Sequence, residues 1–141
     1  MIKLKSLLIT EEKMAFQMER EGKLQFSTAE TPSMTVINMF SNDGKRLGYI
    51  NLTSETPDLG DKQPRPGYLF IDWIETPYEN QGFGFMLYKK ALQYCKKVGV
   101  RGLVSGRDHR IPQADKVWER NKTSSDQYYD YIDWREFERK K

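Results

Sequence analysis

The fold is decided by one stretch of the chain, YLFIDWIETPYENQGFGFML (residues 68–87). It begins with an apolar run over residues 68–74, which is typical of a central strand covered on both faces. Pro77 ends this run, because proline cannot donate a backbone hydrogen bond to a strand ladder. Gly82 and Gly84 follow, two positions apart, where an amphipathic pattern starts. The stretch therefore predicts a buried strand, a tight turn and the beginning of a helix.

A helix over residues 85–98 is predicted to follow the turn. Its apolar residues recur at helical spacing on one face, while its lysines fall on the other. Gly99 provides a natural C-terminal stop. Residues 100–105 then predict a second strand, and two strands joined through a helix lie parallel. Strand, turn, helix and strand therefore form one βαβ unit.

The segments before this unit predict an antiparallel meander. A short helix over residues 10–21 is stopped by Gly22. Asp43 and Gly44 are a hairpin signal, and a loop rich in proline and glycine spans residues 53–67. The three strands are predicted at residues 23–26, 34–40 and 46–52.

The segments after the unit are a predicted helix at residues 112–120, a strand at 128–134 and an exposed charged end at 135–141. The order of elements predicts a single α/β (α+β) domain over residues 1–141. Its central sheet is mixed and mostly antiparallel, with one parallel pair around the strand–turn–helix unit and with flanking helices. A chain of 141 residues can bury such a core without disulfides or a structural metal.

Composition narrows the range of partners. Lys plus Arg exceeds Asp plus Glu by only 23 to 20, so no nucleic-acid partner is expected. One cysteine, Cys95, and one histidine, His109, make neither a disulfide framework nor a zinc cluster, so no metal is expected and a cytoplasmic location fits. The N-terminal apolar run, residues 7–9, is too short for a signal peptide or a membrane span.

The glycine turn is a candidate phosphate site. The first N–H groups of a helix are unpaired and carry about half a positive charge, and glycine lets a phosphate approach them closely. Leu87 stands where the dinucleotide fingerprint needs a small residue, and the G-K-[ST] ending of a P-loop is absent. The alternative is that Gly82 and Gly84 only allow a tight turn.

The turn resembles the coenzyme A signature of the GNAT acetyltransferase superfamily, [RQ]-x-x-G-x-[GA] after the fourth strand. Gly82 and Gly84 match it, whereas Glu79 replaces the usual Arg or Gln. A second family motif, N-x-x-A-x-x-L-Y, aligns with IPQADKVW at residues 111–118. Ile111 replaces its Asn, and Trp118 replaces the Tyr that protonates the departing thiolate in many members.

The resemblance implies acetyl-CoA as cosubstrate, without a metal. The cofactor is expected between the strand ending at Ile74 and the parallel strand near Leu103, on one single acyl-CoA N-acyltransferase domain. The cofactor-binding residues implied by the match are Trp73, Ile74, Glu79, Asn80, Gln81, Gly82, Phe83, Gly84 and Phe85.

Catalysis is expected to be direct attack of an amine on the thioester, which calls for a base, an oxyanion donor and an acid. Glu75, just past the strand end, is the preferred base and Asp72 the second candidate. Counting by twos puts Asp72 with Ile74 and Trp73 with Glu75, so only one carboxylate should face the acceptor. Glu75 as an exposed loop carboxylate is the competing interpretation.

The proton donor is open at this point. Trp118 cannot serve, because an indole N–H does not ionise at useful pH, and it is expected to be a packing residue. Tyr128, Tyr129 and Tyr131 are candidate donors, with a purely structural role in a strand as the alternative.

The function predicted on this basis is N-acetylation of an amine on a small molecule or a protein. Glu55, Asp58, Asp72 and Glu75 near the expected mouth favour a cationic acceptor. The alternative is a catalytically inactive acyl-CoA-binding or protein-interaction module with the same fold. Both are compatible with a homodimer.

Overall fold

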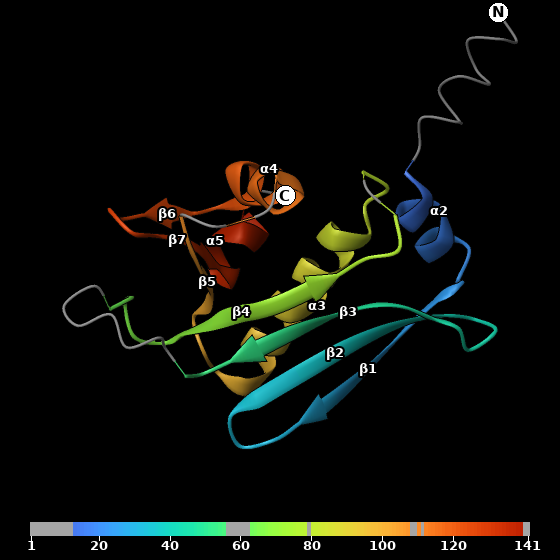
Figure 1. The fold of residues 1–141 in the computed structure, drawn as a ribbon, viewed down its shortest axis with the longest axis horizontal. Coiled ribbons are helices and arrows are strands. Elements are labelled where there is room, and N and C mark those ends of the chain that lie inside the picture. The colour runs from blue at the N-terminus through green and yellow to red at the C-terminus, as the bar shows by residue number, and fades with distance from the viewer. Residues whose placement is uncertain (1–12, 56–62, 79, 108–109, 111, 140–141) are drawn as a thin grey trace, which may run out of the picture.

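One seven-stranded sheet forms the centre of the computed structural model, which describes residues 13–55, 63–78, 80–107, 110 and 112–139 (Figure 1). The strand order is β1-β2-β3-β4-β5-β7-β6. The strands are β1 (Leu24–Glu30), β2 (Met34–Ser41), β3 (Arg46–Thr53), β4 (Tyr68–Glu75), β5 (Gly102–Gly106), β6 (Ser124–Ser125) and β7 (Tyr129–Asp133). The helices are α2 (Met14–Arg20), α3 (Phe83–Val98), α4 (Pro112–Asn121) and α5 (Trp134–Arg139).

The sheet has the predicted mixed topology. β1 to β4 form an antiparallel meander, β4 and β5 are parallel, and β7 pairs antiparallel with β5. The predicted first helix begins only at Met14 among the described residues, so its expected start at Thr10 lies outside them. The α/β fold class is confirmed.

α3 covers one face of the sheet (Figure 1). Its buried side chains include Met86, Leu87 and Ala91, which pack against Ile37 and Ile50 from the meander. The alternation of apolar residues along β2 and β3 explains this, because only one face of those strands is fully buried. A smaller cluster forms on the opposite face of the sheet from Tyr68, Phe70, Val104, Tyr129 and Tyr131.

The parallel pair separates partway along β4. Tyr68, Leu69 and Phe70 pair with β5, but β4 continues to Glu75 without a partner on that side. Beyond Phe70 the two strands are therefore splayed, and the β4 backbone on that edge makes no ladder with β5. Such an edge can pair with an extended ligand.

A β-bulge interrupts β4 at this place. Asn51 pairs with Trp73 and Leu52 with Ile71, so Asp72 is the extra residue. Ile74 consequently packs with Ile71 in the cluster under α3, although counting by twos would separate them. The strict alternation assumed between Asp72 and Ile74 is wrong, because a bulge adds one residue to one strand only.

The C-terminal prediction is also wrong in part. Residues 134–139, expected at the end of a strand and in an exposed tail, form α5, and Phe137 is buried against the core. Asp133 starts this helix by accepting a hydrogen bond from the Arg135 N–H (2.9 Å), and the Trp134 indole donates to the Val100 carbonyl (2.9 Å). An aspartate directly before a helix is a known start signal, so the sequence held this information.

Candidate functional site

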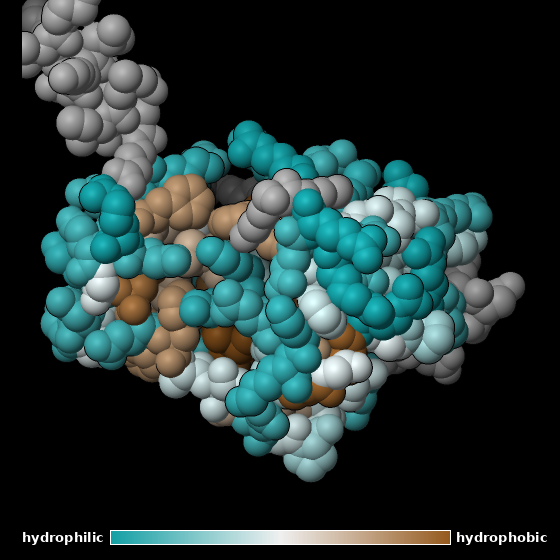
Figure 2. Space-filling model, turned by 180° about the vertical axis from the view of Figure 1, so that it is seen from behind, coloured by the Kyte–Doolittle hydropathy of each residue, from teal (hydrophilic) through white to brown (hydrophobic). Residues whose placement is uncertain are grey.

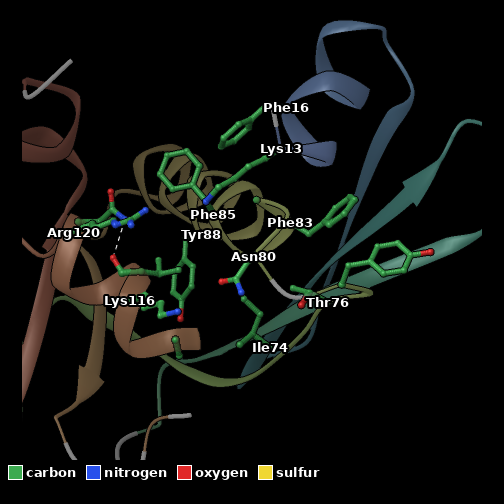
Figure 3. Close-up of a pocket in the computed structure, with 16 residues that line it drawn as sticks. Lys13, Phe16, Ile74, Thr76, Asn80, Phe83, Phe85, Tyr88, Lys116 and Arg120 are labelled. Atoms are coloured by element: carbon green, nitrogen blue, oxygen red, sulfur yellow. Dashed lines mark hydrogen bonds between the residues drawn. The ribbon is translucent and has the colours of Figure 1, made fainter. Parts of the chain in front are cut away.

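A cavity of about 630 Å³ lies between α2, the end of β4, the turn before α3, and α4 (Figure 3). Ile74 and Thr76 come from the strand end, Asn80 and Gly82 from the turn, and Phe83, Gly84, Phe85 and Tyr88 from α3. α4 closes the other side with Ala114, Lys116, Val117 and Arg120. The predicted phosphate turn therefore opens into this cavity.

The turn has the backbone of an anion cradle. Asn80 and Gly82 both adopt left-handed conformations, with φ of 58° and 84°, and Gly82 is the N-cap of α3. Among the described residues, no side chain makes a capping hydrogen bond to this helix end. A Cβ on Gly84 would meet only the Thr76 Cγ2, at 3.9 Å, so its side of the helix is open. Uncapped N–H groups beside a glycine opening fit a phosphate group.

The charge of the cavity wall matches an anion as well. Lys13, Lys116 and Arg120 line the cavity, and none of its lining residues within the described ranges is Asp or Glu. Together with the positive end of the α3 dipole, these cations make the site electropositive. Glu79, the acidic departure from the family motif, lies outside the described residues.

Gln81, predicted to bind the cofactor, contacts the start of α2. Its side-chain Oε1 accepts the Met14 N–H (3.2 Å), and its carbonyl accepts the Ala15 N–H (2.9 Å). The side chain therefore holds the start of α2 instead of facing the cavity. This contact brings Lys13 and Phe16 to the cavity wall, which sequence reasoning missed because it depends on packing between segments about 65 residues apart.

An aromatic pair beside α2 lies between the main cavity and a second groove. Phe16 and Phe85 meet edge to face, with ring centroids 5.8 Å apart, and both line the main cavity. They also line a second groove of about 250 Å³, together with Met86 and Lys89. Apolar side chains gather there on the surface seen in Figure 2.

Part of the cavity wall is apolar. Ile74, Ala114 and Val117 line the cavity, and Tyr88 joins them from α3. Tyr88 is only 4% exposed, and burial raises the pKa of its hydroxyl to about 12. Tyr88 was not among the candidates from sequence, because its position at helical spacing indicated only the core face.

Trp118 is a packing residue, as expected. It is fully buried, does not line the cavity, and lies edge to face with Tyr88 at 5.8 Å between ring centroids. Its indole N–H donates to the Tyr88 hydroxyl oxygen (3.1 Å). Trp118 therefore stands at the position that aligns with the tyrosine of the family motif. It lies behind a different tyrosine, Tyr88, which lines the cavity.

The predicted carboxylates lie on the other side of the strand end. Ile74 and Thr76 line the cavity, whereas Trp73 and Glu75 do not. Trp73 pairs with Asn51 and Glu75 with Tyr49, so both side chains share the sheet face away from α3. Asp72 is exposed at the bulge. The cavity beside the glycine turn and the Glu75 side chain therefore lie on opposite faces of one splayed strand.

The predicted tyrosine donors do not line the cavity. Tyr129 is buried against Phe70, with ring centroids 5.8 Å apart, and Tyr128 is 40% exposed. The Tyr131 hydroxyl donates to Asp126 (2.7 Å) and accepts from the Arg65 N–H (3.0 Å). The lining of the cavity therefore favours Tyr88 over this group.

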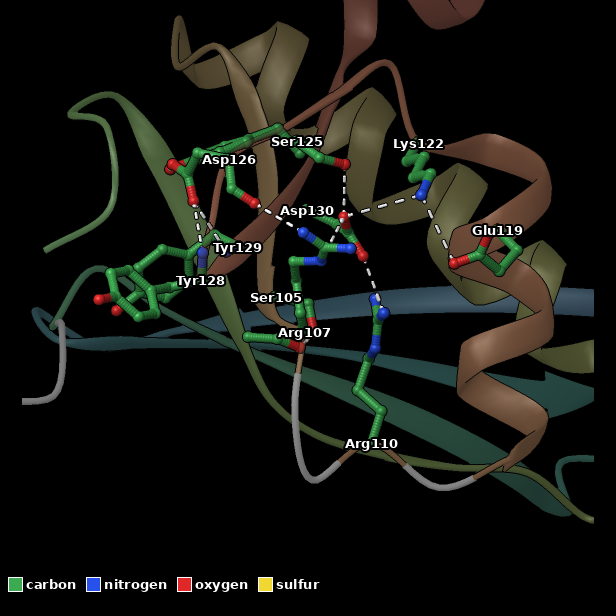
Figure 4. A network of polar contacts seen from close by, with 12 residues as sticks. Ser105, Arg107, Arg110, Glu119, Lys122, Ser125, Asp126, Tyr128, Tyr129 and Asp130 are labelled. Atoms are coloured by element: carbon green, nitrogen blue, oxygen red, sulfur yellow. Dashed lines mark hydrogen bonds and ion pairs between the residues drawn. The ribbon is translucent and has the colours of Figure 1, made fainter. Parts of the chain in front are cut away.

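A buried polar network fixes α4 beside β7 (Figure 4). Asp130 is 1% exposed and accepts hydrogen bonds from Arg110 (2.8 Å) and the Ser125 hydroxyl (2.5 Å). Arg110 also pairs with Asp115 of α4 (2.9 Å) and lies 5.5 Å from the Trp118 ring centre. The network thus supports the wall of the cavity from behind.

Replacing Gly82 by Ala should destabilise the fold as well as the site. The left-handed conformation costs an alanine about 1–2 kcal/mol, and its Cβ would approach Phe16 and Lys13 at 3.3–3.4 Å. Gly99→Ala is the matched control, because Gly99 has the same φ of 84° with nothing within 4 Å. Thermal unfolding should show the larger loss for Gly82→Ala; an equal loss would contradict the packing of α2 on the turn.

No helix among the described residues is long and apolar enough to cross a membrane. No three or more of their His, Cys, Asp and Glu side chains converge as a metal-binding group.

Comparison with known families agrees with the fold and the turn. The family model described as the acetyltransferase (GNAT) family matches residues 2–121. No match was found among curated proteins or among solved structures. The family match covers most of the chain and includes the parallel strands, the glycine turn, α3 and α4. This chain therefore belongs to the GNAT acetyltransferase family.

Proposed function

We propose that the chain is an N-acetyltransferase that moves the acetyl group of acetyl-CoA to an amine by direct attack. The observation that carries the proposal is the cavity at the uncapped start of α3. Three cations and no described carboxylate line it, together with the apolar side chains of Ala114, Val117 and Ile74, the last from the splayed part of β4. This combination of cationic and apolar groups suits a molecule with phosphates at one end and a thioester at the other.

The chain's own groups would each have one task. The N–H groups of the turn, with Lys13, Lys116 and Arg120, would hold the pyrophosphate and the other phosphate. The free backbone edge of β4 beyond Phe70 would pair with the extended pantetheine arm. The cofactor supplies an activated acetyl group, so the protein has to orient it and manage protons.

The acceptor would approach from the sheet face away from α3. Glu75 and the exposed ring of Trp73 lie on that face, and Asp72 is close to them in the bulge. A carboxylate can take a proton from an ammonium group, and an aromatic face attracts a cation. The Asn51 Oδ1 opposite Trp73 is buried without a hydrogen-bond partner among the described residues, so it could accept an N–H. These groups favour a cationic amine on a small molecule or a protein.

The second candidate function is an acyl-CoA-binding module without turnover. It is favoured by Trp118, which replaces the tyrosine that acts as the acid in many family members. Both functions fit a cytoplasmic protein with its one cysteine, Cys95, reduced and buried. The two candidate functions differ only in whether the protein releases free coenzyme A thiol from acetyl-CoA.

Titration calorimetry with acetyl-CoA, followed by thiol release over a panel of amines, tests the proposal. Binding together with amine-dependent release of free thiol is the expected result. Binding without release from any amine would favour the second candidate. Absence of binding would overturn both, because each requires the cofactor in the cavity.

Arg120→Ala should weaken coenzyme A binding by roughly threefold to tenfold, as expected for a partly exposed cation that contacts phosphate. The effect should shrink at high salt, because screening weakens the wild-type interaction. Lys97→Ala is the control, since Lys97 is an exposed cation in the last turn of the same α3 that builds the site. Calorimetry at two salt concentrations checks this; equal effects of the two variants would contradict the assigned phosphate wall.

A further inference from the structure

Two phenols line the cavity among the described residues, Tyr78 and Tyr88. Tyr78 is 55% exposed, whereas Tyr88 is 4% exposed and its hydroxyl is held by Trp118. We propose that Tyr88, oriented by Trp118, donates the proton taken up by the departing coenzyme A thiolate; this inference rests on the proposed function. The proton donor, Tyr88, would then lie on α3. Trp118, at the α4 position where many family members carry their donor tyrosine, would be the residue that orients Tyr88.

The hydrogen bond between the two side chains leaves the proton of Tyr88 available. Trp118 can only donate through its Nε1–H, so the Tyr88 oxygen is the acceptor in their 3.1 Å contact. The Tyr88 O–H must therefore point elsewhere, and its ring lines the cavity together with Ile74 (Figure 3). A hydroxyl that accepts from a fixed donor has few orientations left, so its proton is directed.

Trp118 is itself held firmly. It is fully buried, and the Arg110 guanidinium lies 5.5 Å from its ring centre. Arg110 is fixed by Asp130 (2.8 Å) and by Asp115 (2.9 Å). A chain of contacts thus runs from β7 through α4 to the Tyr88 hydroxyl on α3, and it fixes where that hydroxyl lies.

The proposed step balances. The amine nitrogen forms a bond to the thioester carbonyl carbon, the carbon–sulfur bond breaks, and its electron pair remains on sulfur. The Tyr88 proton moves to sulfur, which gives coenzyme A as the free thiol. The phenolate oxygen is stabilised by the Trp118 N–H until it takes a proton from solvent. The proton lost by the amine leaves through Glu75 or water.

Burial keeps the proposed donor protonated at neutral pH. It raises the pKa of the Tyr88 hydroxyl to about 12. A thiolate formed beside Tyr88, away from water, would have a raised affinity for a proton for the same physical reason. The phenol can therefore act as the acid when the thiolate forms.

Tyr88→Phe tests the donor, with Tyr94→Phe as the matched control. Tyr94 lies on the same helix and bonds Thr35 (3.1 Å) away from the cavity. Tyr88→Phe should lower kcat at least about tenfold without changing coenzyme A affinity more than about twofold. Tyr94→Phe should leave both constants near wild type. A kcat within twofold of wild type in folded Tyr88→Phe overturns the inference.

Trp118→Phe tests the positioning residue through a double-mutant cycle with Tyr88→Phe. It should lower kcat about threefold to tenfold in the wild-type background, yet have no further effect on kcat in a Tyr88→Phe background. A purely structural role predicts the same loss in both backgrounds, so additive effects would count against the inference.

The pH titration of the thiol of bound coenzyme A is a measurement that needs no acceptor amine. A phenol beside the sulfur stabilises the thiolate, so Tyr88→Phe should move the thiolate absorbance to higher pH by at least about half a unit. Subtracting the titration with desulfo-coenzyme A removes the absorbance of tyrosinate. The charged groups around Tyr88 are Arg110 behind Trp118 and Lys13, Lys116 and Arg120 of the cavity, and none of them changes in this variant.

The two hypotheses fail in different ways. Wild-type protein that does not bind coenzyme A in the calorimeter contradicts the proposed function itself. Wild-type protein that binds it, with identical thiol titrations in wild type and Tyr88→Phe, contradicts only the role of Tyr88.

Discussion

Gly84→Asp will abolish coenzyme A binding and leave the protein folded. Gly84 lies in the first turn of α3, and a Cβ there would make only one ordinary contact, 3.9 Å from Thr76. The fold therefore accepts the side chain, but its carboxylate enters the cavity beside the uncapped N–H groups. It neutralises the helix end and repels a pyrophosphate. We expect the dissociation constant to rise at least about 100-fold, or about 2.7 kcal/mol.

Gly84→Ala separates charge from bulk in this experiment. The family signature allows alanine at the corresponding position, and the space around Gly84 accommodates one methyl group. Its effect on binding should therefore be small, and both variants should keep a thermal midpoint within about 3 °C of wild type. Unchanged coenzyme A affinity in folded Gly84→Asp would falsify the assignment of the turn to the cofactor.

Glu75→Gln should lower kcat/KM by roughly 100-fold at neutral pH, because a general base is removed. The amide keeps the size of the side chain on the sheet face shared with Trp73, so acceptor binding should change little. An amine acceptor is mostly protonated at neutral pH and loses that proton by itself at high pH. The ratio of wild-type to variant rates should therefore fall as the pH is raised.

Asp72→Asn is the matched variant for this measurement. Asp72 is exposed at the bulge, two backbone steps from the strand end that meets the cavity. If Glu75 is the base, Asp72→Asn should change kcat/KM by less than about threefold, while the reverse ranking would transfer the role to Asp72. Initial rates of thiol release between pH 6 and pH 10 decide between them.

Local sequence signals were sufficient where one segment determines its own structure. The apolar run of β4, the two glycines and the amphipathic α3 were predicted within two residues of their observed bounds. Each depends on backbone preference or on the period of its side chains, which neighbouring residues set. Asp133 carried a similar start signal for α5, but the charged residues after it were interpreted as an exposed tail.

The sequence could not reveal which groups meet at the cavity. Lys13 and Phe16 arrive there because Gln81 holds α2 across about 65 residues of chain. Lys116 and Arg120 are ordinary surface residues by pattern, and only the docking of α4 turns them toward the start of α3. Such placements depend on long-range packing, which no local pattern contains.

By itself, then, the sequence determined the family, the elements from the meander to α4 and the glycine turn before α3, since these follow from short motifs and from short-range backbone and periodicity rules. Only the tertiary structure decided the faces and partners of the candidate catalytic groups. The bulge at Asp72 breaks the alternation along β4, and the splay beyond Phe70 opens the edge of that strand. The pairing of Tyr88 with Trp118 joins residues from two helices. Each depends on how separate elements register against one another, and that register is set by the packing of the whole core.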